Sequence, residues 1–165
     1  MTSDSEGRGI ISDSMVRFFT EEEWNFLPVQ GQSILQMGFK GKNGSWACYA
    51  QALDEYERFS YHSVMESNVP EDKRLAVSEF LTRVNFGLFM GNFEMDFSDG
   101  ELRYKTAIDV EDGVLTQEMI RKLVYSNVMM MDKYLPGIMS IIYAGTSPAE
   151  AVARIQRNRS STDTE

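Results

Sequence analysis

Two glycine-containing dipeptides constrain the fold more than any other feature of the sequence. Asn43-Gly44 and Asp99-Gly100 each separate two runs in which apolar and polar residues alternate. Such alternation is typical of β-strands, and Asn-Gly suits a type I′ turn because both central residues need positive φ. Since a two-residue turn fixes which residues face each other, the sequence predicts two antiparallel hairpins in defined registers.

The first hairpin joins predicted strands at about residues 33–40 and 45–53, and a tight turn at Asp54-Glu55 leads to a third strand at about 56–65. The predicted inward pairs are Leu35 with Ala52, Met37 with Ala50, Phe39 with Cys48, Ala50 with Phe59 and Cys48 with Tyr61. The opposite face is mostly polar and carries Gln36, Lys40, Tyr49, Gln51, Arg58 and His62. Because both turns give the same apolar face, we expect this face to pack beneath helices.

The second hairpin pairs predicted strands at residues 93–97 and 102–106 across Asp99-Gly100. The expected partners are Phe97 with Leu102 and Met95 with Tyr104 on one face, and Asp96 with Arg103 and Glu94 with Lys105 on the other. Apolar residues meet apolar ones and acids meet bases. Each such pair adds roughly 0.2–1 kcal/mol, so together they favour this register.

Helical patterns flank and separate these strands. Apolar residues recur at helical spacing near residues 11–19, from Pro70 onward and from Thr116 onward, and Ser147-Pro148 opens a short last helix. Pro136-Gly137 should interrupt the third helix and leave residues 138–143 as a separate segment. The predicted fold is α+β, an antiparallel five-stranded sheet with helices on one face. The predicted order is α-β-β-β-α-β-β-α with a small terminal α.

The chain has 165 residues, the length of one domain. We expect a flexible N-terminal lead over residues 1–10, a single α+β domain over 11–157 and a flexible tail over 158–165. The lead is polar and acidic, unlike a secretory signal, and the lone Cys48 fits a reducing compartment. The protein is therefore expected to be cytoplasmic.

Cys48 and His62 are the single members of their types and form the first catalytic pair to consider. Nucleophilic catalysis requires the two side chains to lie within about 3 Å of each other. The predicted strands place them on opposite faces of the sheet. One cysteine and one histidine also cannot form a closed zinc site, so we expect no catalytic residues, no metal and no cofactor.

Charge and hydropathy restrict the partners. The formal net charge is −9, which disfavours nucleic acid because binding to phosphates depends on basic residues. The most apolar stretch, residues 128–143, is shorter than the ~20 residues of a membrane helix and contains Asp132, Lys133 and Pro136. We expect a buried helix there and no membrane partner.

Methionine is the unusual component of the composition, with eleven residues and a run at Met129-Met130-Met131. Three consecutive positions cover about 300° of a helix, so these side chains cannot all face one core. The alternatives are a helix packed on several sides, a self-association interface and a groove for a protein client. The candidate partner-binding residues are Met130, Tyr134, Met139 and Tyr143.

Three blocks of sequence also carry a family resemblance. They are residues 70–85 (PEDKRLAVSEFLTRVN), 91–96 (GNFEMD) with Tyr104-Lys105-Thr106, and 123–127 (LVYSN) with 131–138 (MDKYLPGI). These blocks resemble the YbjN-like family, its cyanobacterial branch in particular, over about residues 12–156. The resemblance implies a fold like that of type III secretion chaperones and a role in sensory transduction or regulation. It implies neither catalytic residues nor a cofactor.

The leading hypothesis is a non-enzymatic protein-interaction module, chaperone-like or regulatory, that acts as a homodimer on an unknown protein client or regulatory partner. Chaperones of the related fold are commonly acidic dimers, and this chain is acidic too. The alternative is a small-ligand sensor with a pocket between the sheet and its helices. An apolar cavity containing a few convergent polar groups would distinguish this alternative.

Overall fold

The structure is a computed structural model that describes residues 9–162, with side chains described for residues 9–158. Its helices are α1 (Ile10–Glu21), α2 (Arg74–Asn85), α3 (Gln117–Ala144) and α4 (Pro148–Thr162). Its strands are β1 (Phe26–Pro28), β2 (Ile34–Lys40), β3 (Ser45–Leu53), β4 (Arg58–Val64), β5 (Asn92–Met95) and β6 (Leu102–Asp109). The predicted α+β class is confirmed. Helix α4 continues into the range 158–165 assigned to a tail, whose flexibility stays a prediction.

The sheet has six strands in the order β1-β2-β3-β4-β6-β5, all paired antiparallel, so the prediction of five strands is wrong. The additional strand is β1, in which Phe26 lies opposite Met37 of β2. Three residues ending in Pro28 show no alternating pattern, which is why sequence reasoning missed this strand. Tertiary packing supports it, because the Phe26 ring lies 6.4 Å from that of Phe19 on α1.

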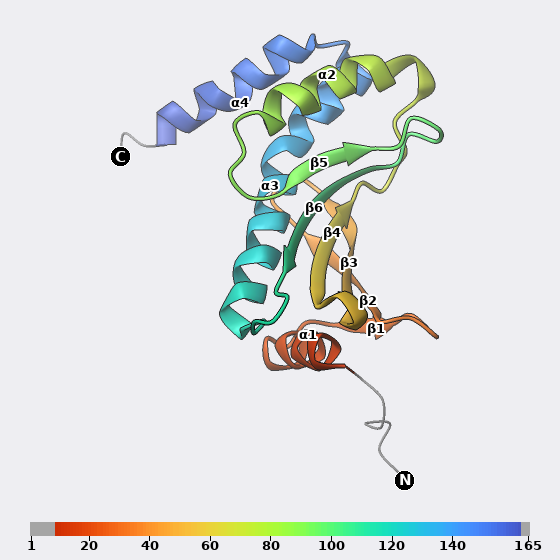
Figure 1. The fold of residues 1–165 in the computed structure, drawn as a ribbon. Coiled ribbons are helices and arrows are strands. Elements are labelled where there is room, and N and C mark those ends of the chain that lie inside the picture. Colours follow the sequence, from red (N-terminus) through yellow and green to blue (C-terminus); the bar gives the residue numbers. More distant parts are fainter. Residues whose placement is uncertain (1–8, 163–165) are drawn as a thin grey trace.

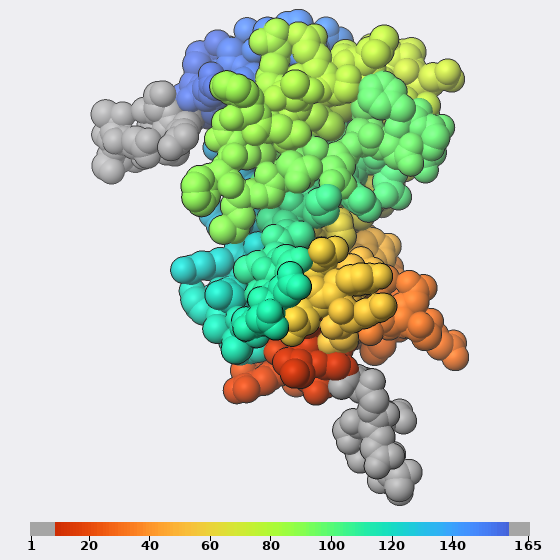
Figure 2. All heavy atoms as spheres, viewed as in Figure 1, coloured from red at the N-terminus to blue at the C-terminus, as the bar shows by residue number. Residues whose placement is uncertain are grey.

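The helices lie against one face of the sheet, as predicted. Helix α3 runs along the sheet and also contacts α1, α2 and α4 (Figure 1). Figure 2 shows α2 and α4 gathered at one end of the molecule and α1 at the other. The predicted inward face is confirmed, since its residues are buried: Leu35, Met37, Cys48, Ala50, Ala52, Phe59 and Tyr61.

Every predicted hairpin register is wrong by two residues, a shift that preserves the inward face. Met37 lies opposite Cys48 instead of Ala50, and Cys48 lies opposite Ser63 instead of Tyr61. In the second hairpin Met95 lies opposite Leu102 instead of Tyr104. Side chains have a period of two along a strand, so a two-residue shift changes partners without turning the strand over.

The corrected pairs across the first two turns are Leu35 with Ala50, Phe39 with Trp46, Ala50 with Tyr61, and Ala52 with Phe59. In the second hairpin Phe93 lies opposite Tyr104, Glu94 opposite Arg103 and Asn92 opposite Lys105. The predicted pairs of Phe97 with Leu102, Asp96 with Arg103 and Glu94 with Lys105 are absent, because Asp96 and Phe97 belong to the turn.

The loop between β2 and β3 explains the first shift. It contains four residues, 41–44, and neither Asn43 nor Gly44 has the positive φ of a type I′ turn. The carboxylate of Asp132 on α3 accepts hydrogen bonds from the backbone N–H groups of Lys42 and Asn43, at 3.0 and 2.7 Å. A side chain distant in the sequence therefore stabilises a wider loop than the dipeptide alone predicts.

The other two connections are widened in a similar way. Asp54–Tyr56 form a short 3-10 turn followed by Glu57 at a φ of 50°, and Asp54 accepts hydrogen bonds from the N–H groups of Ile11 and Ser12. Asp54 thus caps the start of α1 instead of forming a two-residue turn. In the loop at 96–101, Asp96 accepts from the N–H of Ser98, and Gly100 has a φ of 82°.

Helix α3 is continuous through Pro136, so the predicted interruption is wrong. Proline has no N–H group, which leaves the Asp132 carbonyl, four residues earlier, without its helical donor. The side-chain amide of Asn43 donates to this carbonyl at 3.0 Å. The β2–β3 loop thus replaces the hydrogen bond that proline removes, while Asp132 stabilises the loop in return.

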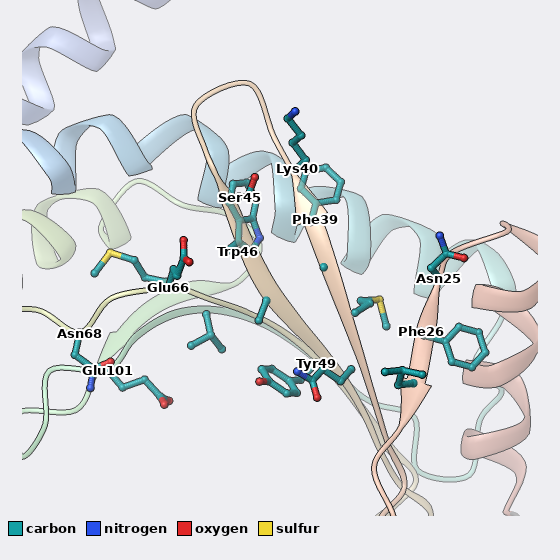
Figure 3. Close-up of a pocket in the computed structure, with 17 residues that line it drawn as sticks. Asn25, Phe26, Phe39, Lys40, Ser45, Trp46, Tyr49, Glu66, Asn68 and Glu101 are labelled. Atoms are coloured by element: carbon teal, nitrogen blue, oxygen red, sulfur yellow. The ribbon is translucent and has the colours of Figure 1, made fainter.

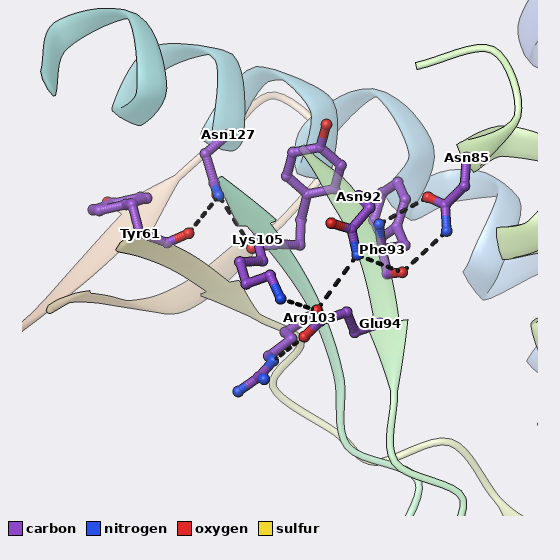
Figure 4. A network of polar contacts seen from close by, with 9 residues as sticks. Tyr61, Asn85, Asn92, Phe93, Glu94, Arg103, Lys105 and Asn127 are labelled. Carbon is purple, nitrogen blue, oxygen red and sulfur yellow. Dashed lines mark hydrogen bonds and ion pairs between the residues drawn. The ribbon is translucent and has the colours of Figure 1, made fainter. Parts of the chain in front are cut away.

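A buried polar residue joins α3 to the middle of the sheet. Asn127 donates to the carbonyls of Tyr61 on β4 and Tyr104 on β6 (Figure 4), and it accepts from the Ser63 hydroxyl at 2.6 Å. The Ser63 hydroxyl in turn accepts from the Trp46 indole N–H. Since unpaired buried polar groups are costly, this network fixes how α3 lies on the sheet.

Candidate partner-binding surfaces

The predicted separation of Cys48 and His62 is confirmed. Cys48 is fully buried on the inner face, with its Sγ 3.5 Å from the Ser63 Oγ, and burial raises the pKa of its thiol. His62 lies opposite Tyr49 on the outer face, where burial, with the nearby Arg103 charge, lowers its pKa to about 4. A protonated thiol and an imidazole on the opposite face of the sheet do not form a nucleophilic pair.

Within residues 9–162, no group of three or more His, Cys, Asp or Glu is placed to hold a metal ion. No helix in this described part of the chain has the length and apolarity needed to cross a membrane.

A groove lies on the outer face of the sheet, which the helices leave uncovered (Figure 3). We call it the sheet groove; its volume is about 1100 Å³. Its floor is formed by side chains of β2, β3 and β4 that point away from the helices, including Ala47, Tyr49 and Val64. A Cβ placed on Gly38 would meet no atom within 4 Å, so the floor is open there.

Charged residues are confined to the ends of the sheet groove. Lys40 lies at the end near the β2–β3 loop, and Glu66 and Glu101 lie at the end near β6. Between them the floor combines small apolar groups with the half-buried Tyr49. Sequence reasoning missed this groove because its face looked like ordinary polar surface. The sequence signal that could have revealed the groove is a set of small or apolar residues at outward positions of neighbouring strands, namely Gly38, Ala47 and Val64.

Beside the groove, the outer face of β4, β6 and β5 carries a compact ion cluster (Figure 4). Glu94 pairs with Arg103 at 2.8 Å and with Lys105. Partial burial by itself would raise the pKa of Glu94, but the hydrogen bonds from Lys105 and Arg103 outweigh it and hold the pKa at about 2. The carboxylate is therefore charged at neutral pH and neutralises the adjacent bases.

The residues predicted as a partner surface on α3 do not all line one hollow, and their role in binding a partner stays a prediction. Met130 and Tyr134 line a hollow of about 460 Å³ together with Phe89, from the loop between α2 and β5. Met139 is nine positions after Met130, about half a turn away around the helix, and is partly buried. Tyr143 is 75% exposed and also lies outside this hollow. As predicted, the methionine run faces several ways, since Met131 is buried and Met129 exposed.

A family profile matches residues 12–139 of the chain. The profile is YbjN, described as "Putative bacterial sensory transduction regulator". The chain belongs to the YbjN family. No curated protein matches it by sequence. The predicted family resemblance is thereby confirmed.

Solved structures resemble the YbjN-family fold described here. YbjN from E. coli superposes with a TM-score of 0.56 at 13% sequence identity, covering 73% of this chain and 85% of that one. A chain of the ExsC-ExsE complex superposes with a TM-score of 0.55 at 15% identity, covering 75% of this chain and 90% of that one. At these identities the likeness shows a shared fold alone.

Proposed function

We propose that this YbjN-family chain is a non-enzymatic protein-interaction module with a chaperone-like or regulatory role. The observation that carries the proposal is the sheet groove, an open hollow of about 1100 Å³ across strands that no helix covers. Its volume lies at the upper end of small-molecule sites, and its shallow floor suits an extended stretch of polypeptide. Family membership supports a regulatory role, and a chain of similar fold occurs in the complex between ExsC and ExsE.

The floor of the groove determines which partner segment fits. Gly38 and Ala47 leave space close to the backbone, while Tyr49 offers both an aromatic ring and a hydroxyl. An extended segment with alternating apolar residues would place one side chain in every two on this floor, because successive strand residues point to opposite sides. Lys40 at one end and Glu66 at the other would then set the direction of the segment.

Substitutions in the groove test this proposal. Tagged protein carrying Tyr49→Asp or Gly38→Glu should lose the partner that the wild-type protein retains from its native cytoplasm, as measured by quantitative mass spectrometry. Tyr56→Asp, at an exposed tyrosine outside the groove, is the matched control and should retain the partner. Equal retention by all variants, each folded by circular dichroism, would reject the groove as the binding site.

We also propose that the protein acts as a homodimer. The exposed apolar side chain of Leu75 on α2 marks a surface that pairing of two copies would cover. Sedimentation velocity at micromolar concentration measures the mass directly. A monomer under these conditions would remove the dimer from the proposal without affecting the groove.

A second candidate function is a small-ligand sensor. A hollow of about 350 Å³ lies between α1 and strands β1 and β2, and its lining mixes apolar Met15 and Val16 with Ser12 and Gln32. This is the combination of an apolar cavity with a few polar groups that ligand sites show. A thermal-shift screen of metabolites tests it, with Val16→Trp as the variant that fills the hollow. A reproducible shift that this variant abolishes would favour the sensor.

A further inference from the structure

The loop between α2 and β5, residues 86–91, presents two phenylalanines to solvent. Phe86 and Phe89 are 96% and 102% exposed, the highest values among the large apolar side chains described. They border different hollows. Phe86 lies beside the groove between α2 and α4, whereas Phe89 lies beside the hollow that contains Met130 and Tyr134. We call the second one the α3 hollow.

Aromatic side chains of the core pack beneath the α3 hollow. The Tyr134 ring packs edge-on against the rings of Phe93 and Phe80, at centroid distances of 5.8 and 6.4 Å. The loop above it is fixed at its end, because the Tyr104 hydroxyl donates to the Met90 carbonyl. At Gly91 the φ is 77°, and a Cβ there would lie 2.6 Å from the Lys105 carbonyl oxygen. The exposed position of Phe89 thus follows from a constrained backbone.

The charges around the α3 hollow are all positive. Its lining contains two ionisable residues of opposite sign to the chain's net charge, Lys122 and Lys133, and no acid. Neither lysine forms an ion pair with a described residue. The Lys133 Nζ instead lies 5.1 Å from the centre of the Tyr134 ring, which holds its charge at the edge of the hollow.

We propose that the α3 hollow binds an acidic peptide segment of a partner protein. One aromatic or aliphatic side chain of the segment enters the hollow between Phe89 and Tyr134, and flanking carboxylates pair with Lys122 and Lys133. The volume of about 460 Å³ accommodates a single large side chain. This site lies on the helical side of the sheet and goes beyond the proposed function, which uses the opposite face.

Charge favours this occupant over two others. In a two-fold pairing, a second copy would bring its own Lys122 and Lys133 to the same surface, so self-association there places like charges together. Single-stranded nucleic acid needs a basic groove that follows its backbone over several nucleotides, whereas two lysines flank a single hollow here. A short acidic segment with one apolar anchor matches both the size and the sign of the site.

Fluorescence anisotropy with a defined probe tests the proposal. The probe is a short fluorescein-labelled peptide of Glu, Asp and Ala with one central Trp, and its matched control replaces every acid by Lys. We expect the full-length protein to bind the acidic probe and not the basic one. Phe89→Ser should weaken binding by about tenfold or more, as loss of a central anchor does. Raising the ionic strength from about 0.05 to 0.5 M should also weaken it.

Matched variants make the result specific to this hollow. Lys122→Glu and Lys133→Glu should each weaken binding of the acidic probe, whereas Lys40→Glu changes the net charge equally but lies in the sheet groove. Phe86→Ser removes an equally exposed phenylalanine from the same loop and should leave probe binding unchanged. Because Lys40 lies in the sheet groove, a loss of probe binding confined to Lys40→Glu would place the probe in that groove and overturn the inference.

Several outcomes would overturn the inference. These are no binding of the acidic probe at about millimolar protein, equal binding of the basic probe, and equal loss with Phe86→Ser. A monomeric mass for Phe89→Ser where the wild type is a dimer would assign the hollow to a second copy instead. Tighter binding of a labelled oligothymidylate that Lys122→Glu abolishes would assign it to nucleic acid.

Discussion

Replacing Asn127 should show how far one buried amide determines the packing of α3 on the sheet. Its side chain has no exposed surface and makes four hydrogen bonds. It donates to the Tyr61 carbonyl at 2.8 Å, the Tyr104 carbonyl at 3.1 Å and the Thr106 hydroxyl at 3.2 Å, and it accepts from Ser63 at 2.6 Å. Asn127→Leu keeps a similar volume and removes all four.

The magnitude follows from the partners left behind. A buried hydrogen bond contributes about 1 kcal/mol net, and an orphaned buried acceptor costs about 1–3 kcal/mol. The Ser63 oxygen still accepts from Trp46, and the Thr106 hydroxyl still donates to the Leu123 carbonyl. The Ser63 O–H and the two strand carbonyls each lose a partner, and we expect the free energy of unfolding to fall by about 3–5 kcal/mol. That is a large share of the roughly 5–15 kcal/mol of an ordinary domain.

A second substitution at the same position tests the donor role separately. Asn127→Asp keeps the shape but turns an acceptor toward the carbonyls unless the introduced carboxyl is protonated. The pKa of the introduced carboxyl should therefore be higher in the folded state than the unfolded value of about 3.9. The variant then loses stability as pH rises through the folded pKa. The deficit relative to wild type should be larger at pH 7 than at pH 4.5.

Urea unfolding followed by far-ultraviolet circular dichroism measures both variants against wild type at the two pH values. An unchanged slope with a lower midpoint would attribute the loss to the native state. A loss below about 1 kcal/mol for Asn127→Leu, or a deficit for Asn127→Asp that does not change with pH, would refute this account of the network.

Three further predictions concern other polar contacts. Asn43→Ala should lower the free energy of unfolding by about 0.5–1.5 kcal/mol in wild type. The loss should be smaller in a Pro136→Ala background, where a backbone N–H restores the helical hydrogen bond. A urea double-mutant cycle measures the coupling between the two positions, and additive effects would contradict it. Asn85 donates to the Phe93 carbonyl and accepts from the Phe93 N–H, so it covers the edge of β5 (Figure 4). Asn85→Ala should expose this edge and promote self-association, which sedimentation velocity measures as a higher mass. A mass equal to that of wild type would argue against this role. His62 has a pKa of about 4 in the folded state against about 6.5 in the unfolded state, so stability falls as pH falls through this window. Between pH 6.5 and 4, wild type should lose about 1–2 kcal/mol more of its free energy of unfolding than His62→Gln, allowing for partial exposure. Parallel curves of stability against pH for the two proteins would refute this.

Local patterns in the sequence predicted the class of the fold, the inward face and most helices. Amphipathic periodicity placed Met15, Phe18 and Phe19 on the buried side of α1, and all three are buried. Thr116 caps α3 by accepting from the N–H of Met119, close to where the sequence placed the start of that helix. These features depend on residues within a few positions of each other, which is why sequence alone reveals them.

The errors have a common physical origin in contacts between distant residues. The register of the first hairpin depends on Asp132, about ninety positions from the loop that it holds. The continuity of α3 depends on Asn43, equally distant, and β1 depends on the packing of Phe26 against Phe19. No local propensity encodes these contacts, so the wider loops and the sixth strand appeared only in three dimensions.

For the candidate sites too, the sequence predicted what depends on local patterns and missed what depends on contacts between distant residues. Sequence reasoning identified Met130 and Tyr134, which do line one hollow, because the methionine run is a local anomaly. It could not find Phe89, since one phenylalanine in a loop has no pattern to distinguish it. Nor could it separate Met139 from Met130, because the interruption expected at Pro136 concealed their true relation around a single helix.

The β2–β3 loop at residues 41–44 implies a parity rule for changes in chain length. Inserting or deleting two residues there would alter strand partners while leaving Cys48 beneath the helices, whereas a single-residue change would rotate β3 half a turn about its axis relative to β2. Such an odd change would turn Tyr49 into the core and Cys48 toward water. Length variation among relatives should therefore occur in steps of two at this loop, and an engineered one-residue insertion should unfold the domain where a two-residue insertion does not.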